Sequence, residues 1–233
     1  PSEESPCAAA IFSDIFDAAG VPDGVFNLVQ GDGPGVCTML TMHEDVDMVS
    51  FTGSTRAGII IAKNAADTVK RVHQELGGKT PNIVLEGSDL SEAVPNGLQG
   101  VIINSRQSCI APPRMLVHES QYDEAVQTAK GVMESLKVGD PTEMGQHIGP
   151  VVNAAQYEKI QGLIQAGIDE GGKVETGGTG RPDGVNQGFY VKPTVFSDIT
   201  SDMTIAREEI FGPVVTLIKY ENDEEALEIA NDT

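Results

Sequence analysis

The sequence has few basic residues for its length. Its 15 lysines and arginines stand against 35 aspartates and glutamates, so the formal net charge is -20 at pH 7. This charge opposes binding to the phosphates of nucleic acids and to anionic membrane surfaces. We therefore expect neither nucleic acid nor a membrane as a partner.

Cysteines and histidines are too sparse for a disulfide framework or a metal site. The three cysteines, Cys7, Cys37 and Cys109, are odd in number and show no CxxC spacing. The four histidines lack the spacing of zinc ligands. We expect reduced thiols and no bound metal.

Long apolar runs are absent as well. No run reaches the ~18 residues of a membrane-spanning helix, and the first residues, PSEESPCAAAIF, lack the basic region of a signal peptide. These absences predict a cytoplasmic protein. The chain starts at Pro1 without a Met and stops at Thr233 within a helical pattern, so we expect an interior stretch of a longer protein.

What the sequence does contain is an alternation of helical and strand patterns. Helices expected at 5–19 and near 35–42 alternate with strands expected at 24–31 and 48–53, and such alternation implies an α/β fold with a parallel sheet. A Gly-Gly turn at 77–78 is the plausible domain boundary. Further elements are expected after this turn: strands at 81–85, 114–120, 188–199 and 211–220, and helices at 122–136 and 154–172.

The segment FTGSTRAG, at 51–58, has the features of a dinucleotide-binding turn. A strand leads into a Gly-Ser turn, and the next helix offers free N–H groups and a positive dipole end to a pyrophosphate. The same pattern is also that of an ordinary helix cap. The segment alone does not decide between the two.

Two polar positions are candidates for chemistry, although each has an ordinary alternative. Cys109, in NSRQSCIAPPR, has a turn-like polar setting, whereas most cysteines are buried as small apolar residues. Glu75 lies at a strand end before Gly77-Gly78, and most such glutamates are merely solvated. Cys7 and Cys37 have no comparable context, so we assign them a structural role.

Taken together, the motifs FTGST, ELGGK, QSC and EIFGP occur in an order that resembles the aldehyde dehydrogenase superfamily. The resemblance extends through PSE at the start, PNIV, IGPVV, GFYVKPTVF and IAREEIFGPV, and so covers the whole chain. It implies part of a Rossmann-like parallel-sheet cofactor domain at 1–78. Most of an α/β catalytic domain of the aldehyde dehydrogenase fold is then expected at 79–233.

The resemblance also implies a reaction. Cys109 corresponds to the nucleophile that attacks an aldehyde to give a thiohemiacetal, which is oxidised to a thioester. Glu75 corresponds to the base that activates water to hydrolyse the thioester to a carboxylic acid. Branches of the superfamily that pass the acyl group to coenzyme A or phosphate generally lack this glutamate, so its presence indicates hydrolysis.

The expected cofactor is NAD rather than NADP. Glu3 corresponds to the residue that binds the adenosine ribose hydroxyls, where a carboxylate would repel a 2′-phosphate. Phe211 corresponds to a residue near the nicotinamide ring, although core packing would equally explain a phenylalanine. The remaining cofactor-binding candidates are Thr52, Gly53 and Ser54 near the pyrophosphate, Leu76, and Glu209 at the nicotinamide ribose.

Arg106 departs from the family pattern, which usually has glycine there. Its charge would lower the pKa of Cys109, or its bulk would obstruct cofactor or substrate; the sequence leaves both open. Pro112-Pro113 is also unusual, and the family's lysine before PSE and its oxyanion-hole asparagine would lie outside this chain. The alternative function is therefore a non-catalytic relative that binds a nucleotide without turnover. Complete relatives are dimers or tetramers, so a homo-oligomer is expected.

Overall fold

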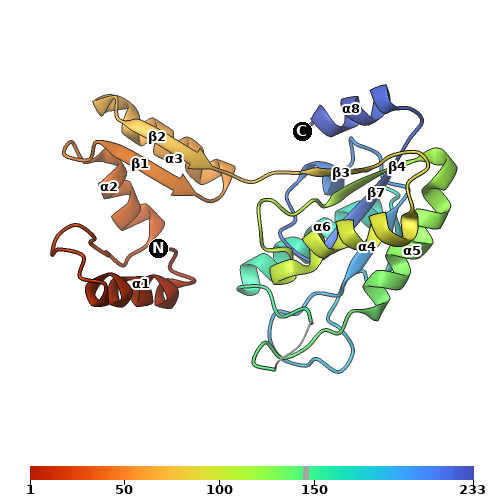
Figure 1. The fold of residues 1–233 in the computed structure, drawn as a ribbon, viewed down its shortest axis with the longest axis horizontal. Helices are drawn as coiled ribbons and strands as arrows, with labels where there is room; N and C mark the ends of the chain where they lie inside the picture. Colours follow the sequence, from red (N-terminus) through yellow and green to blue (C-terminus); the bar gives the residue numbers. More distant parts are fainter. Residues whose placement is uncertain (144–146) are drawn as a thin grey trace. The chain divides into compact units, whose positions relative to one another are not determined.

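The computed structural model describes residues 1–143 and 147–233 and consists of two compact units, Pro1–Gly77 and Gly78–Thr233 (Figure 1). Each unit combines parallel strands with helices that connect them. The expected α/β class with parallel sheets is thus confirmed. No helix in these described ranges is long and apolar enough to span a bilayer.

The first unit is built on two parallel strands, β1 (Met48–Thr52) and β2 (Arg71–Glu75), joined by helix α3 (Thr55–Ala65). This is a βαβ connection, in which the helix returns the chain to the start of the next parallel strand. Before it come α1 (Pro6–Ala18), a π-helical turn (Gly33–Cys37) and α2 (Thr38–Met42). A 3₁₀ turn (Ala66–Thr68) follows α3.

The strand expected at 24–31 is wrong. These residues form a turn and an unpaired stretch, and Val25 and Phe26 are exposed. A strand needs a neighbour for its backbone N–H and C=O groups, and the described sheet of this unit pairs only β1 with β2. The apolar pattern was therefore a poor guide to pairing.

The second unit is a five-stranded sheet in the order β3-β4-β7-β6-β5. All neighbouring pairs are parallel except β5 with β6. Its strands are β3 (Pro81–Val84), β4 (Arg114–His118), β5 (Lys173–Thr176), β6 (Thr194–Ser197) and β7 (Val214–Tyr220). Its helices are α4 (Leu90–Ile102), α5 (Tyr122–Ser135), α6 (Ala154–Asp169), α7 (Thr204–Arg207) and α8 (Asp223–Asn231).

Two apolar clusters cover the two faces of this sheet. One joins α4 and α5 to side chains such as Val117, Val215 and Leu217. The other joins α6, α7 and α8 to neighbours in the same strands, such as Leu116, Val214 and Ile218. Alternate residues of one strand thus face opposite layers, as in a doubly covered parallel sheet.

The strand expected at 188–199 is shorter than predicted. Only Thr194–Ser197 pairs in the sheet, as β6. Pro193 immediately precedes it and has no N–H to donate to a ladder. Val191 is nevertheless buried in the second cluster, so the apolar pattern there reflects core packing outside a strand.

Candidate functional site

In the first unit, the predicted cofactor turn lies at the carboxyl ends of β1 and β2. Thr52 and Glu75 are register partners at the last position of each strand. The Gly53 N–H donates to the backbone carbonyl of Glu75 at 3.0 Å. The parallel pairing therefore brings FTGST and ELGGK together, at the sheet edge where open α/β folds bind ligands.

Ser54 begins helix α3 as its N-cap. Its Oγ accepts a hydrogen bond from the Ala57 N–H at 3.3 Å. Ser54 is therefore a helix cap, as one of the two interpretations of this segment predicted. It does not remove the dinucleotide interpretation, because the other N–H groups of the first turn and the helix dipole remain available to an anion.

Leu76 packs against α3. A Cβ placed on Gly58 would lie 2.7 Å from a Leu76 methyl carbon, so only glycine lets the two come this close. The Gln74 side-chain amide donates to the Gly58 carbonyl at 2.6 Å and ties β2 to the helix at the same place. This packing holds the end of β2, where ELGGK begins, against helix α3.

The two carboxylates predicted in this unit are exposed. The Glu75 side chain is 65% exposed and approaches the His73 ring at 3.8 Å. Glu3 lies in an exposed turn just before α1. Both are therefore free to meet water or a ligand.

In the second unit, Cys109 lies in a turn beyond a strained loop. Three consecutive residues, Asn104, Ser105 and Arg106, have φ between 54° and 59°, in the left-handed region. For residues with a side chain this conformation costs about 1–2 kcal/mol each. Such strain persists only where surrounding contacts enforce it, and it concentrates at functional sites.

Those contacts come from the IGPVV segment. The Ser105 Oγ donates to the Gly149 carbonyl at 2.8 Å, and the Val152 N–H donates to the Gln107 side chain at 2.8 Å. Gln107 and Asn104 also bond to each other's backbone carbonyls at 3.1 Å. The cysteine loop is therefore anchored within its strained turn, at Ser105, and just after it, at Gln107.

Cys109 is half-buried. Within the described ranges, its backbone N–H donates no hydrogen bond to the protein. An unused N–H beside a nucleophile can stabilise the oxyanion that forms when the nucleophile attacks a carbonyl. Cys7 and Cys37 are exposed and have no such loop around them.

Glycine 78 is the point where three of the recognised motifs meet. A Cβ on Gly78 would lie 3.8 Å from the Cys109 carbonyl oxygen. The Gly78 N–H donates to Oε1 of Glu209 at 3.3 Å. ELGGK, QSC and EIFGP are thus neighbours in the fold, as a shared site requires.

Phe211 does not belong to the core. It is half-buried with φ of 58°, and its backbone carbonyl accepts from the Gln156 side chain at 3.1 Å. The preceding Ile210 is the residue that enters the second apolar cluster. Phe211 itself is a member of neither apolar cluster.

A buried cationic group beside this site was not predicted from the sequence. Lys79 is 6% exposed and donates to the Ile205 carbonyl at 3.0 Å. Arg114 is 1% exposed and donates to the carbonyls of Lys79, Ile229 and Ala230. Lys79 belongs to ELGGK, but nothing local to the sequence showed that its side chain would be buried.

Arg106 is the third member of this group. Its side chain is 1% exposed, and its Nε and Nη1 atoms are buried without a hydrogen-bond partner among the described residues. Leaving buried donors unpaired costs about 1–3 kcal/mol for each group. Burial lowers the pKa of Arg106 to about 10, opposed by the charge of Glu209, so the guanidinium stays cationic at pH 7.

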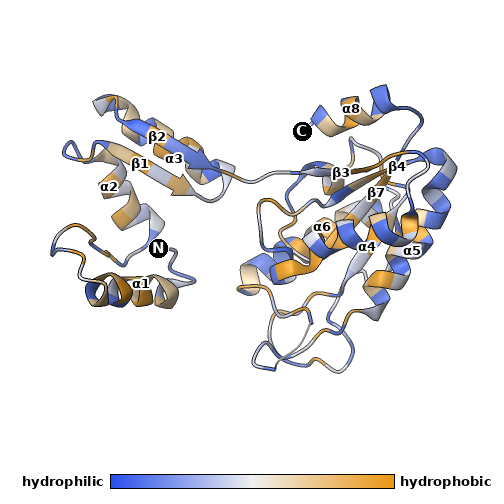
Figure 2. Cartoon of the chain, in the orientation of Figure 1, coloured by the Kyte–Doolittle hydropathy of each residue, from blue (hydrophilic) through white to orange (hydrophobic). Residues whose placement is uncertain are grey.

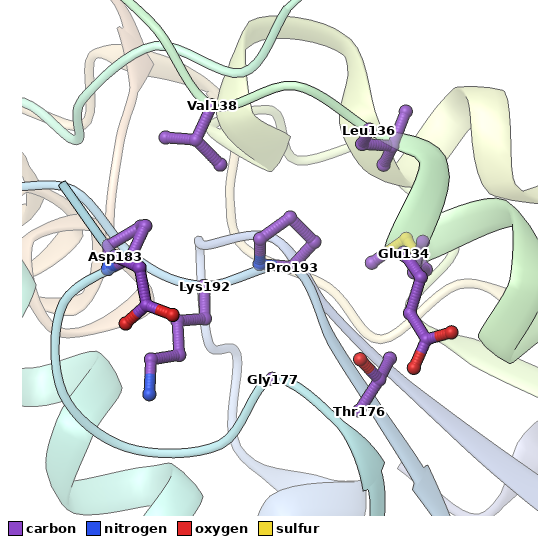
Figure 3. A pocket seen from close by; sticks show the side chains of 10 residues that line it. Glu134, Leu136, Val138, Thr176, Gly177, Asp183, Lys192 and Pro193 are labelled. Atoms are coloured by element: carbon purple, nitrogen blue, oxygen red, sulfur yellow. The ribbon is translucent and has the colours of Figure 1, made fainter. Parts of the chain in front are cut away.

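A separate cavity lies in the second unit. It has a volume of about 410 Å³, with Asp183 and Lys192 on one side and Glu134 on the other (Figure 3). None of the predicted site residues lines it. Over residues 1–143 and 147–233, no group of three or more His, Cys, Asp or Glu side chains is arranged to hold a metal ion.

Comparison with known proteins agrees with the motifs. The model of the aldehyde dehydrogenase family matches residues 1–233. A 3-succinoylsemialdehyde-pyridine dehydrogenase from a Pseudomonas species is 51% identical over 233 residues, which are 100% of this chain and 49% of that protein. The chain therefore spans about half the length of the curated relatives it matches.

Solved structures give the same result. An aldehyde dehydrogenase from Bartonella henselae superposes with a TM-score of 0.98 at 52% identity, over 100% of this chain and 49% of that one. A mutant of aldehyde dehydrogenase C from Pseudomonas syringae, solved with NAD+ and octanal, gives 0.98 at 50% identity, over 100% and 48%. With the motifs, the fold and the family match in agreement, this chain belongs to the aldehyde dehydrogenase family.

Proposed function

We propose that the complete protein carrying this chain oxidises an aldehyde to a carboxylic acid with NAD+. The observation that carries the proposal is the meeting of three motifs at Gly78, where the cysteine loop and Glu209 both contact the ELGGK turn. Residues without a shared function would not be expected to lie together at one turn. The first unit would be part of the dinucleotide-binding domain, and the second most of the catalytic domain.

The chemistry starts at Cys109. Its thiolate would attack the aldehyde carbon, and the carbonyl oxygen, now an anion, would accept a hydrogen bond from the Cys109 N–H, which donates to no other group among the described residues. When bound, NAD+ accepts the hydride that leaves this carbon. Glu75 would then take a proton from water as that water attacks the thioester, which releases the acid and returns the Cys109 thiolate.

The described residues fit such a cofactor. Thr52, Gly53 and Ser54 lie at the carboxyl end of a parallel strand and the start of a helix, where a pyrophosphate can accept hydrogen bonds from backbone N–H groups. We assign Leu76, Glu209 and Phe211 to the nicotinamide end and Glu3 to the adenosine ribose. A carboxylate at that ribose favours NAD over NADP. The NAD+ complex of the Pseudomonas syringae relative supports the assignment.

The substrate is proposed only as an aldehyde. One relative is named a 3-succinoylsemialdehyde-pyridine dehydrogenase, and another was solved with octanal. These two aldehydes differ in size and polarity. A nucleophilic thiolate must stay reduced, so we propose a cytoplasmic setting. We also propose a homo-oligomer, a dimer or tetramer, for the complete protein.

Serine substitutions of the three cysteines test the reaction. In the complete protein, C109S should lower kcat at least about 10³-fold because the nucleophile is lost. C7S and C37S, as matched controls on exposed cysteines, should leave kcat within about twofold. Equal losses in all three variants would contradict the assignment of Cys109.

The second candidate is a relative that binds nucleotide without turnover. Arg106 favours it, because this strained and buried residue stands in the cysteine loop where the family usually has glycine, and its Nε and Nη1 have no partner among the described residues. Thiol labelling separates the two functions. A built catalytic site requires Cys109 to react with iodoacetamide faster than Cys7 and Cys37, although it is the least exposed of the three, whereas slower labelling supports the binding-only relative.

A further inference from the structure

Arg114 joins three backbone carbonyls that lie far from it in the sequence. Its Nε donates to the Lys79 carbonyl at 2.7 Å, its Nη1 to the Ile229 carbonyl at 2.8 Å and its Nη2 to the Ala230 carbonyl at 3.0 Å. The side chain is 1% exposed. The planar fork of this buried guanidinium therefore holds the ELGGK turn, β4 and the end of α8 in one arrangement.

The first of these carbonyls lies directly after Gly78. Arg114 is the first residue of β4 and the register partner of Pro81, the first residue of β3. Pro81 has no N–H to donate to a ladder. The Arg114 side chain instead binds the backbone two residues before Pro81, at Lys79, and so fixes the turn that precedes the strand.

The backbone of Arg114 is itself restrained close to Cys109. Thr216 of β7 donates to the Pro113 carbonyl from its backbone N–H at 2.9 Å and from its Oγ1 at 3.2 Å. Pro112-Pro113 also fixes two φ angles between the cysteine turn and β4. Only a short and restrained stretch of chain therefore separates Cys109 from Arg114.

The side chain of Lys79 closes a ring through the same elements. Its Nζ donates to the Ile205 carbonyl of α7 at 3.0 Å, and the ion pair Arg207–Asp232, at 2.6 Å, joins α7 to the residue after α8. Arg114 completes the ring at the last turn of α8, where a cation is favourable. The ion pair is exposed and contributes little, so the buried bonds of Arg114 and Lys79 hold the ring together.

We propose that Arg114 is a positioning residue that holds Gly78 of the ELGGK turn against the cysteine loop and Glu209. The Gly78 N–H donates to Glu209 at 3.3 Å, and a Cβ on Gly78 would lie 3.8 Å from the Cys109 carbonyl oxygen. The effect on catalysis rests on the proposed function, in which Cys109 attacks the aldehyde while Glu209 holds the nicotinamide ribose. A shift of about 1 Å in such a site can lower the rate about 10²-fold.

Three variants separate positioning from general stability. R114M removes the three donors, and R114K keeps the charge but has one nitrogen in place of three. Y122F is the matched control in the same unit. Tyr122 is 4% exposed, and its hydroxyl donates to the Leu217 carbonyl at 3.1 Å and accepts from the Asp198 N–H at 2.9 Å. Y122F thus loses buried hydrogen bonds, but none to the three motifs that meet at Gly78.

The first experiment measures amide hydrogen exchange of the complete protein by mass spectrometry, without aldehyde or nucleotide. In R114M the amides of residues 76–80 should exchange at least about tenfold faster than in wild type, because the turn is released. Those of α5 should stay within about twofold. In Y122F residues 76–80 should exchange as in wild type. Unchanged exchange at 76–80 in R114M, or an equal acceleration of α5, would overturn the proposal.

The second experiment measures kcat and KM of the complete protein for an aldehyde. R114M should lower kcat about 10- to 100-fold and change KM less than about threefold, because Arg114 lies outside the proposed aldehyde site. Y122F should keep kcat within about twofold. Equal losses of kcat in R114M and Y122F would contradict the positioning role, as would a kcat of R114M within twofold of wild type.

R114K should change both readouts in the same direction by at least about threefold, and it decides the question if R114M does not fold. Wild-type exchange and kcat in R114K would then overturn the proposal. Absence of turnover in the wild-type protein, together with faster exchange confined to residues 76–80 in the Arg114 variants, would instead contradict the proposed function and leave the positioning of the turn supported.

Discussion

The two units place similar apolar residues in different environments. In the second unit, two clusters of buried side chains pack on both faces of the sheet. In the first unit, the fully buried apolar residues are Ile61 and Ala65, and α1 has no buried residue. Figure 2 shows hydrophobic colouring on much of α1, where Ile11, Phe12 and Ile15 are more than half exposed.

The comparison shows that helices and strands can form where few apolar side chains are buried. Helices α1 and α3 and strands β1 and β2 form in the first unit from helical periodicity, the Ser54 cap of α3 and backbone pairing. In this chain, which spans about half the length of its relatives, burial of apolar surface is concentrated in the second unit, and such burial supplies most of the folding free energy. We therefore expect the second unit to be the more stable of the two within this chain, while both units carry proposed site residues.

The largest expected effect compares the same substitution in the two units. Leu98 is 0% exposed in the first cluster of the second unit, and Leu40 is 48% exposed in α2. L98A should lower the free energy of unfolding by about 2–5 kcal/mol because it leaves a cavity. L40A should change it by about 0.5 kcal/mol or less. Urea denaturation of this chain measures both, and equal losses would break the comparison.

The pH dependence of stability sharpens the role of the buried cations in the second unit. Burial, aided by Arg106 and Arg114, lowers the pKa of Lys79 from 10.5 to about 7. Between pH 7 and pH 10.5 the Lys79 amine is protonated in the unfolded chain and mostly deprotonated in the folded chain. The free energy of unfolding therefore rises with pH over this range. K79M should remove this rise, at most about 1.4 kcal/mol per pH unit.

Unfolding of the K79M variant is compared with wild type at pH 7, 8 and 9. The control is K63M, at an exposed lysine of α3 in the first unit, which should follow wild type. Parallel pH curves for K79M and wild type would mean that the pKa of Lys79 is not lowered in the folded chain.

The smallest expected effect concerns Ser54, the N-cap of α3. S54A removes the bond to the Ala57 N–H and should destabilise the helix by about 0.5–2 kcal/mol. S54D, which retains a capping oxygen, is the matched control. Hydrogen exchange of the α3 amides measures the change, and equal protection in S54A and wild type would show that the cap contributes nothing.

Much of the architecture could be predicted from the sequence because its signals are local. The strands expected at MVSFTG and RMLVHES and the helix expected at 122–136 correspond to β1, β4 and α5. The strand expected at 24–31 failed because pairing depends on a neighbouring strand. The strand expected at 188–199 was too long because Pro193 precedes the paired part.

The candidate site divides in the same way. The motifs predicted which segments belong together, and the contacts at Gly78 agree for ELGGK, QSC and EIFGP. The burial of Lys79, Arg106 and Arg114 could not be predicted, because it arises from segments far apart in the chain, such as the carbonyls of Ile205 and Ile229. A charged residue in a motif is ordinarily expected at the surface.

The most direct test of the proposed reaction is to trap the acyl group on the enzyme. The E75Q variant of the complete protein is mixed with an aldehyde and NAD+, and the protein is digested for mass spectrometry. If Cys109 is the nucleophile and Glu75 the base for hydrolysis, the peptide with Cys109 gains the mass of the acyl group and one equivalent of NADH forms. Continued turnover without an adduct, or an adduct on Cys7 or Cys37, would contradict the account.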